Sequence, residues 1–205
     1  VLFTLPHPDR RPTHVEFSPD GSRLLTLGAN DLTVWDIGSK REIPELRFDD
    51  VRAASFSSDS RFLLVRRSGT VRVYEIARRE AGAELRHENY LLDDALFGSD
   101  ATTLVIVGGG YARVWDARSG AALTPPLAHG SRANVRHAVI SGNGRLVVTA
   151  ADDGSVRLWD AQTGQPLSAR LVHGTDTPAI AIAPDATRIA TAGNSVVRLW
   201  QISPE

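Results

Sequence analysis

Short apolar runs recur along the chain, each bounded by Gly, Asn, Asp or Ser residues. Such runs of aliphatic and β-branched residues predict strands buried on both faces. The runs occupy residues 23–27, 61–65, 103–107, 145–149 and 188–192. The segments that follow them alternate in polarity, as residues 155–160 do, with the period of two typical of a strand. The pattern therefore predicts an all-β fold of antiparallel hairpins, with tight turns at the intervening glycines.

The same arrangement repeats along the whole chain. An aromatic residue followed by an acidic or amide residue recurs every 39 to 44 positions. These pairs are Trp35 and Asp36, Tyr74 and Glu75, Trp115 and Asp116, Trp159 and Asp160, and Trp200 and Gln201. About twenty residues before each pair lies a turn segment such as Ser-Pro-Asp-Gly at 18–21. Four short strands in each unit, with the aromatic pair closing the third, are typical of a β-propeller blade.

At this point the chain resembles the WD40 repeat family, and the unit at 127–160 is the closest match. The resemblance implies a β-propeller of WD40-like four-stranded antiparallel blades, about five in this chain. We expect a single propeller domain or segment over residues 1–205. The expected blades cover approximately residues 8–49, 50–88, 89–130, 131–174, and 175–205 completed by 1–7.

Two arrangements of the blades remain open. Residues 2–7 look like a fourth strand without its first three partners, and the chain stops after a third strand. Both ends could complete one blade and close a ring of five. Alternatively, the chain is cut from a larger array, since the family usually closes with seven blades and this sequence contains no Met. The second arrangement is slightly favoured.

Four histidines occupy one position of the repeat: His7, His87, His129 and His173. Zinc needs ligand nitrogens at ~2.0–2.1 Å, whereas equivalent positions in packed sheets lie roughly 10 Å apart, so we predict no metal and no cofactor. The WD40 resemblance implies a structural hydrogen-bond network instead. Its members would be His129, Thr149, Asp153 and Trp159. The position of Asp153 holds Ser68, Gly109 or Asn194 in other units, where we expect an incomplete network and lower stability.

Composition narrows the function. The chain is 42% hydrophobic and 23% charged with a net charge of −1, as expected of a soluble folded domain. No apolar run is long enough to span a membrane, and no cationic surplus favours nucleic acid or anionic lipid. The absence of Cys excludes disulfides and thiolate chemistry.

Candidate catalytic residues are few. No nucleophile elbow, zinc-protease motif or calcium loop is present. Glu16, Asp93 and Asp94 could lie near a central channel, which leaves a hydrolase as a weak alternative. A carbohydrate-binding, lectin-like propeller is the other alternative, although only 6% of the residues are aromatic. We therefore predict that the chain is not an enzyme.

Binding of a protein partner is the function that we expect. Loops at the starts of the inner strands and turns between second and third strands gather on one face of a propeller, where recognition usually resides. Arg and Tyr are enriched at interface hot spots. The candidate rim residues are His14, Arg52, Arg66, Arg67, Tyr90, Asp93, Arg136 and His137.

The wider context rests on resemblance alone. The strand ends around 123–130 look like WD40 arrays appended to large bacterial signalling proteins, including Ser/Thr kinases. This implies a cytoplasmic protein-protein interaction scaffold, a monomeric unit within a longer signalling or regulatory polypeptide. The sequence does not identify its partner.

Overall fold

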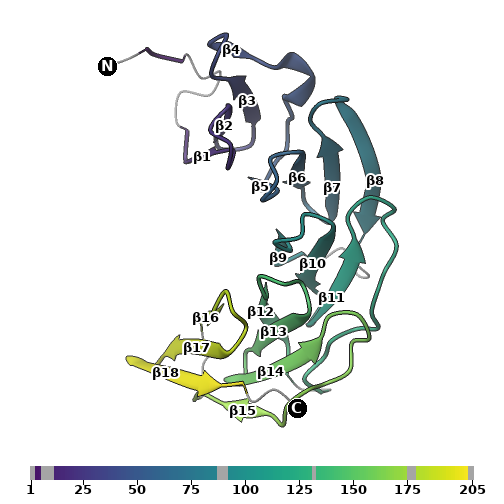
Figure 1. Ribbon diagram of the computed structural model, residues 1–205, viewed down its shortest axis with the longest axis vertical. Helices are drawn as coiled ribbons and strands as arrows, with labels where there is room; N and C mark the ends of the chain where they lie inside the picture. Colours follow the sequence, from purple (N-terminus) through teal and green to yellow (C-terminus); the bar gives the residue numbers. More distant parts are fainter. Residues whose placement is uncertain (1–2, 6–11, 87–91, 131–132, 175–178, 203–205) are drawn as a thin grey trace. The chain divides into compact units, whose positions relative to one another are not determined.

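The computed structural model describes residues 3–5, 12–86, 92–130, 133–174 and 179–202. The chain forms two compact units, Val1–Leu85 and Arg86–Glu205. In these described segments, strands make up nearly all of the regular structure, and the only helix is the short 3-10 helix η1 (Pro44–Leu46) (Figure 1). Among the described residues, no helix is long and apolar enough to cross a membrane.

The first unit contains two four-stranded antiparallel sheets. Sheet 1 consists of β1 (His14–Phe17), β2 (Arg23–Leu27), β3 (Leu32–Asp36) and β4 (Arg41–Glu42). Sheet 2 consists of β5 (Ala53–Phe56), β6 (Phe62–Arg66), β7 (Thr70–Glu75) and β8 (Glu80–Arg86). In both sheets each strand pairs with the next strand of the sequence, which is the predicted meander.

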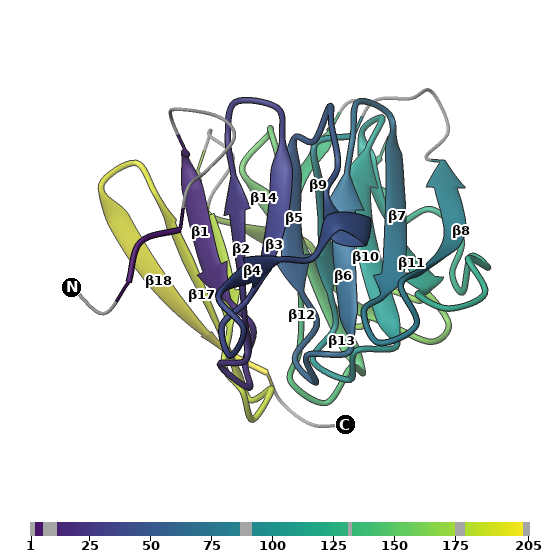
Figure 2. The same cartoon turned by 90° about the horizontal axis from the view of Figure 1, so that it is seen from above.

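The second unit contains three antiparallel sheets. Sheet 3 consists of β9 (Asp94–Phe97), β10 (Thr103–Gly108) and β11 (Tyr111–Asp116). Sheet 4 consists of β12 (Val135–Ile140), β13 (Leu146–Ala151), β14 (Ser155–Asp160) and β15 (Leu171–Val172). Sheet 5 consists of β16 (Ala179–Ile182), β17 (Arg188–Gly193) and β18 (Val196–Gln201), and Figure 2 shows β17 and β18 from a second direction.

The fold class is confirmed as all-β, with about five propeller-type blades. The aromatic pairs end the third strand of every sheet, at Asp36, Glu75, Asp116, Asp160 and Gln201. Each sheet lies within one of the five predicted blade ranges. The single domain, and the completion of the fifth blade by residues 1–7, remain predictions.

Sheet 3 differs from the expected four strands. The segment after β11 makes isolated bridges only, from Leu127 to Ala112 and from Ala122 to Trp115. Pro125 and Pro126 interrupt it, because proline has no N–H to donate to a strand. The Thr124 hydroxyl takes up one strand donor instead, accepting from the Val114 N–H at 3.1 Å.

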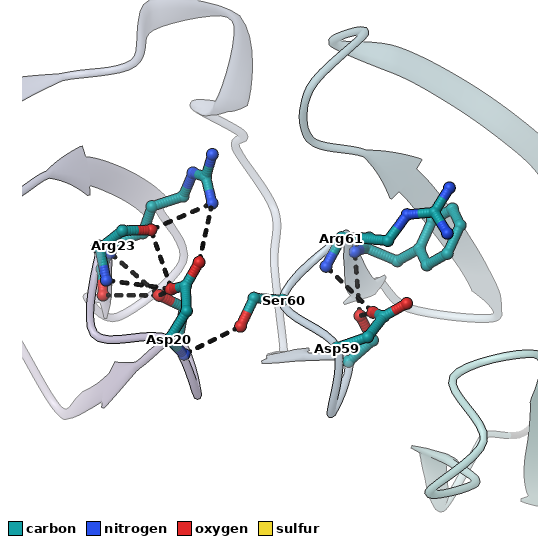
Figure 3. Close-up of polar contacts among 9 residues, drawn as sticks. Asp20, Arg23, Asp59, Ser60 and Arg61 are labelled. Atoms are coloured by element: carbon teal, nitrogen blue, oxygen red, sulfur yellow. Dashed lines mark hydrogen bonds and ion pairs between the residues drawn. The ribbon is translucent and has the colours of Figure 1, made fainter.

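The turn between the first and second strands has the same geometry in every sheet. Its third residue is Asp or Asn, whose side chain accepts the backbone N–H two residues on, as Asp20 accepts from Ser22 at 3.0 Å. Its fourth residue has a left-handed backbone, with φ of 69° at Gly21 and 60° at Ser60. The Asp20 N–H also donates to the Ser60 hydroxyl at 3.0 Å, which joins the turns of sheets 1 and 2 (Figure 3).

Sheets that are neighbours within a unit stack through apolar faces. We call the face toward the following sheet the forward face and the opposite one the backward face. The forward face of sheet 4 is formed by Val148, Ala150, Val156 and Leu158. It packs against the backward face of sheet 5, formed by Ile180, Ile182, Ile189, Trp200 and Ile202. Sheets 3 and 4 and sheets 1 and 2 make the same kind of contact.

Candidate functional site

A chain of buried hydrogen bonds crosses the backward face of sheet 4. The Trp159 Nε1–H donates to the Thr149 hydroxyl at 2.7 Å, and that hydroxyl lies 2.6 Å from His129 Nε2. On the other side of the ring, His129 Nδ1 lies 2.6 Å from the Ser155 hydroxyl, which donates to Asp153 at 2.5 Å. The four residues that the sequence selected are therefore linked in one network. Ser155 is an additional member, placed between His129 and Asp153.

The direction of donation fixes the protonation of His129. Because the Ser155 proton goes to the Asp153 carboxylate, Ser155 accepts from His129 Nδ1–H. His129 Nε2 then accepts from the Thr149 hydroxyl, which in turn accepts from Trp159. Every donor and acceptor in the network is satisfied when the imidazole is neutral.

Burial favours that neutral form. The His129 side chain is buried, and this desolvation, together with the nearby Arg157 cation, lowers the pKa of His129 to about 4. Asp153 acts in the opposite direction but does not outweigh burial. Burial acts to raise the pKa of Asp153 itself, whereas hydrogen bonds from Ser155 lower it, and the net result is below the ordinary value. Arg170 supports the charged carboxylate through an ion pair of 2.5 Å.

Sheet 5 has a related network that the sequence led us to expect to be incomplete. His173 Nδ1 lies 2.6 Å from the Thr191 hydroxyl, which accepts from Trp200 Nε1–H at 2.9 Å. His173 Nε2 lies 3.0 Å from the Gly193 carbonyl oxygen. A backbone acceptor thus takes the place of the missing carboxylate. The network of sheet 5 therefore lacks a carboxylate, as the sequence predicts, but the Gly193 carbonyl gives His173 a partner that the residue pattern does not show. The lower stability of this sheet remains a prediction.

The other sheets retain smaller parts of the network. In sheet 1 the Trp35 Nε1–H donates to Thr26 at 2.9 Å, while His7 lies outside the described residues. Sheets 2 and 3 carry Val65 and Ile106 at the position of Thr149. Within the part of the chain that is described, the buried Trp115 Nε1–H of sheet 3 has no hydrogen-bond partner.

The predicted rim residues divide between the two units. In the first unit His14 is exposed and lies 3.6 Å from Glu16, and Arg52 contacts Ser68 at 3.2 Å and Asn30 at 3.3 Å. Arg66 and Arg67 are half-buried at the end of β6 and in the turn that follows. Tyr90, like His87, lies outside the described residues. His14 and Arg52 are therefore already engaged in polar contacts within the first unit.

In the second unit the rim residues come together. Asp93, Asp94, Arg136 and His137 line a hollow of about 330 Å³ at the starts of β9 and β12. Arg136 lies 3.5 Å from Asp93 and 3.6 Å from Asp152. Asn134 donates to Asp152 at 2.8 Å and is the main cause of the lowered pKa of that carboxyl.

A β-bulge shapes this hollow. The register between β12 and β13 shifts between Val135 and His137, so Arg136 and His137 are consecutive and both exposed. Bulges commonly re-aim side chains in this way. The sequence analysis missed Asp152 and Asn134. The break in alternation at 135–138 is the signal that points to the bulge.

The candidate catalytic carboxylates have local partners. Glu16 accepts the Phe56 N–H at 3.1 Å, and Asp94 accepts the N–H of Ala95 at 2.8 Å. Asp93 pairs with Arg136. Among the described residues, no group of three or more His, Asp or Glu is arranged to hold a metal ion.

Residues 124–160 match the family model described as WD domain, G-beta repeat. The matched segment contains the whole network of His129, Thr149, Asp153, Ser155 and Trp159. The chain therefore carries a WD40 repeat, and its resemblance to the WD40 repeat family is confirmed. A comparison with curated proteins gave no significant match. WD40 propellers generally mediate protein–protein interactions and are generally not enzymes.

Proposed function

We propose that the chain is a non-catalytic scaffold for protein binding. We further propose that it is the WD40 region of a larger bacterial signalling or regulatory protein in the cytoplasm. The WD40 repeat at 124–160 supports the general role. We propose that the partner binds at the hollow formed by Asp93, Asp94, Arg136 and His137. This hollow is the observation on which the proposal rests.

The hollow has the chemistry of a recognition site. Its side chains are polar or charged, and the sheet ends hold them in place. Arg136 and Asp93 remain 45% and 36% exposed, so their ion pair can exchange for a pair with a partner at small cost. Asp93, Asp94 and Asp152 outnumber Arg136, and the excess of carboxylates favours a basic side chain. We therefore infer that the partner places a Lys or Arg in the hollow.

We also propose that the rim residues of the first unit contact a protein partner. His14, Arg52, Arg66 and Arg67 lie at strand starts or in turns between second and third strands, as in the second unit. Tyr90 belongs to the proposed rim from its sequence position. No observation favours the alternatives: Trp35 and Trp159 are each 4% exposed and unavailable for stacking on sugars, and the candidate catalytic carboxylates cap backbone or pair with Arg.

Selection of peptides from a display library tests the hollow directly. We expect the peptides retained by the 205-residue chain to carry Lys or Arg. Replacing both acids, Asp93→Asn with Asp94→Asn, should weaken their binding about tenfold or more, because the charge attraction is lost while the size of each side chain is kept. Isothermal titration calorimetry of the best peptide measures the change.

A matched control is Arg118→Ala. Arg118 is exposed in the turn after β11, at the opposite end of sheet 3 from Asp94. Its replacement should leave peptide binding unchanged. If the double variant binds the selected peptides as tightly as the parent chain, the hollow is not the contact surface.

A further inference from the structure

The hollow at the starts of β9 and β12 already holds a cation, the guanidinium of Arg136. One terminal nitrogen of this group lies 3.5 Å from the Asp93 carboxylate in sheet 3. The other terminal nitrogen lies 3.6 Å from the Asp152 carboxylate in sheet 4. The planar group therefore spans two carboxylates that come from neighbouring sheets. A guanidinium has a fixed fork of donors that suits this arrangement, whereas the ammonium of a lysine is a compact point charge.

The two carboxylates are positioned by groups other than Arg136. Asp152 accepts the backbone N–H of Asn134 at 2.9 Å and the side-chain amide of the same residue at 2.8 Å. Asp93 is fixed through its backbone, because its N–H donates to the Val107 carbonyl at 2.9 Å. The hollow should therefore keep its shape when the Arg136 side chain leaves it.

Arg136 itself is weakly held. Both of its ion-pair distances are longer than those of ordinary hydrogen bonds, and exposed pairs of this kind stabilise a protein little. Its side chain is 45% exposed, so it can swing out into solvent. Asp94 also lines the hollow, and among the described residues it pairs with no basic side chain. An incoming cation therefore meets negative charge even before Arg136 moves.

We propose that the hollow is a guanidinium site and that Arg136 is its internal occupant, which an arginine of the partner displaces. The assignment rests on the proposed function and narrows the partner's basic residue from Lys or Arg to Arg. While Arg136 remains in place, its charge opposes the entry of a second cation, because like charges repel. Arg136 thus determines specificity: it lowers the affinity for any cation and favours the one that can replace both of its ion pairs.

Titration of the 205-residue chain with N-acetyl-arginine amide tests the proposal, with the NMR signals of the Asn134 side-chain amide as the readout. Arg136→Gln removes the internal occupant and keeps a polar side chain. This variant should bind the arginine amide about tenfold more tightly than the parent chain does. It should bind N-acetyl-lysine amide about threefold less tightly than the arginine amide. Arg136→Lys keeps the charge without the fork, so its affinity should fall between those of the parent chain and the Gln variant.

A matched control is Arg145→Gln. Arg145 is exposed in the turn after β12, at the opposite end of sheet 4 from the hollow. This variant loses the same charge as Arg136→Gln, and its affinity for the arginine amide should equal that of the parent chain. Adding Asp93→Asn and Asp94→Asn to Arg136→Gln should abolish the gain. Circular dichroism should be unchanged in every variant.

Two results overturn the proposal: an Arg136→Gln variant that binds the arginine amide no more tightly than the parent chain, and equal binding of the two amides by that variant. The proposed function is tested separately, by the peptides selected on the parent chain. If Asp93→Asn with Asp94→Asn weakens those peptides while Arg136→Gln gains nothing, the partner binds the hollow but Arg136 is not its internal occupant. If the arginine amide gains affinity while the peptides ignore both acids, the guanidinium site stands and the proposed function fails.

Discussion

Sheets 3 and 4 carry a tryptophan at the same position, but the indole N–H has different surroundings in the two sheets. Trp115 pairs with Leu104 across its hairpin as Trp159 pairs with Val147. The Trp159 N–H enters a buried network, whereas the buried Trp115 N–H meets no acceptor among the described residues. The acceptor of the tryptophan N–H is Thr149 in sheet 4, and the equivalent position of the second strand in sheet 3 holds Ile106, which has no hydroxyl.

One hydroxyl therefore decides what the tryptophan contributes. In sheet 4 the Thr149 hydroxyl accepts from Trp159 and donates to His129, so the ring is both packed and oriented by polar contacts. In sheet 3 the ring packs and has the Arg113 guanidinium over its face at 5.4 Å, but its N–H makes no hydrogen bond among the described residues. Sheets 1 and 5 follow sheet 4 in this respect, through Thr26 and Thr191. A buried donor without a partner costs roughly 1–3 kcal/mol, so the two sheets should differ in stability.

The largest expected effect separates the two tryptophans. Trp159→Ala should cost about 4 kcal/mol, because it opens a cavity at a residue 4% exposed and removes a partner of Thr149. Trp115→Ala should cost about half as much, since Trp115 is half-buried and its N–H makes no bond among the described residues. Amide hydrogen exchange in β14 and β11 measures each change locally. A loss below about 1 kcal/mol for Trp159→Ala would contradict its role in the network.

The next largest effect is the pH dependence of the free energy of unfolding, which tests the network around His129. The pKa of His129 is about 4 in the folded protein and 6.5 in the unfolded chain. The unfolded state therefore binds a proton first, so stability is intact above pH 6.5 and declines as the pH falls toward 4. The loss should reach about 2.5 kcal/mol by pH 4.5, before the aspartates with lowered pKa values titrate.

Urea denaturation followed by hydrogen exchange in β13 and β14 between pH 7.5 and 4.5 measures this loss. His129→Gln is the matched variant, because its amide retains hydrogen-bonding groups but does not titrate. We expect the variant to be less stable at neutral pH and to lose much less on acidification. An equal pH dependence in both proteins would show that His129 is not held neutral.

The sequence predicted the repeat and the strands because these follow from local patterns. Each aromatic pair falls at the end of a third strand, and alternation identifies the strands on its own. His129, Thr149, Asp153 and Trp159 were identified through the WD40 resemblance, which is strongest in the segment that matches the family model.

The sequence was less informative where the backbone or the tertiary packing supplies the partner. The Gly193 carbonyl replaces a side chain in sheet 5, and a carbonyl leaves no mark in the residue pattern. The missing fourth strand of sheet 3 follows from Pro125 and Pro126, which were present in the pattern but not weighed. The link between Arg136 and Asp152 depends on a bulge that brings distant residues together.

The prediction with the smallest expected effect concerns a substitution that gives sheet 3 the threonine found at the equivalent position of sheet 4. Ile106→Thr should place a hydroxyl where Thr149 lies, within reach of the Trp115 N–H. Ile106→Val is the matched control, since Val has the shape of Thr without the hydroxyl. Burying a hydroxyl in an apolar core ordinarily makes Thr less stable than Val. Here we expect the Thr variant to be more stable than the Val variant by about 1 kcal/mol, as measured by urea denaturation.

A second background identifies the partner of the new hydroxyl. Trp115→Phe removes the N–H while keeping an aromatic ring, so the advantage of Thr over Val should disappear when it is combined with either variant. The difference between the two backgrounds is then the energy of one hydrogen bond, isolated from the packing that both variants share. If Val is the more stable in both backgrounds, the Trp115 N–H does not reach position 106, and the contrast between sheets 3 and 4 does not depend on this hydroxyl.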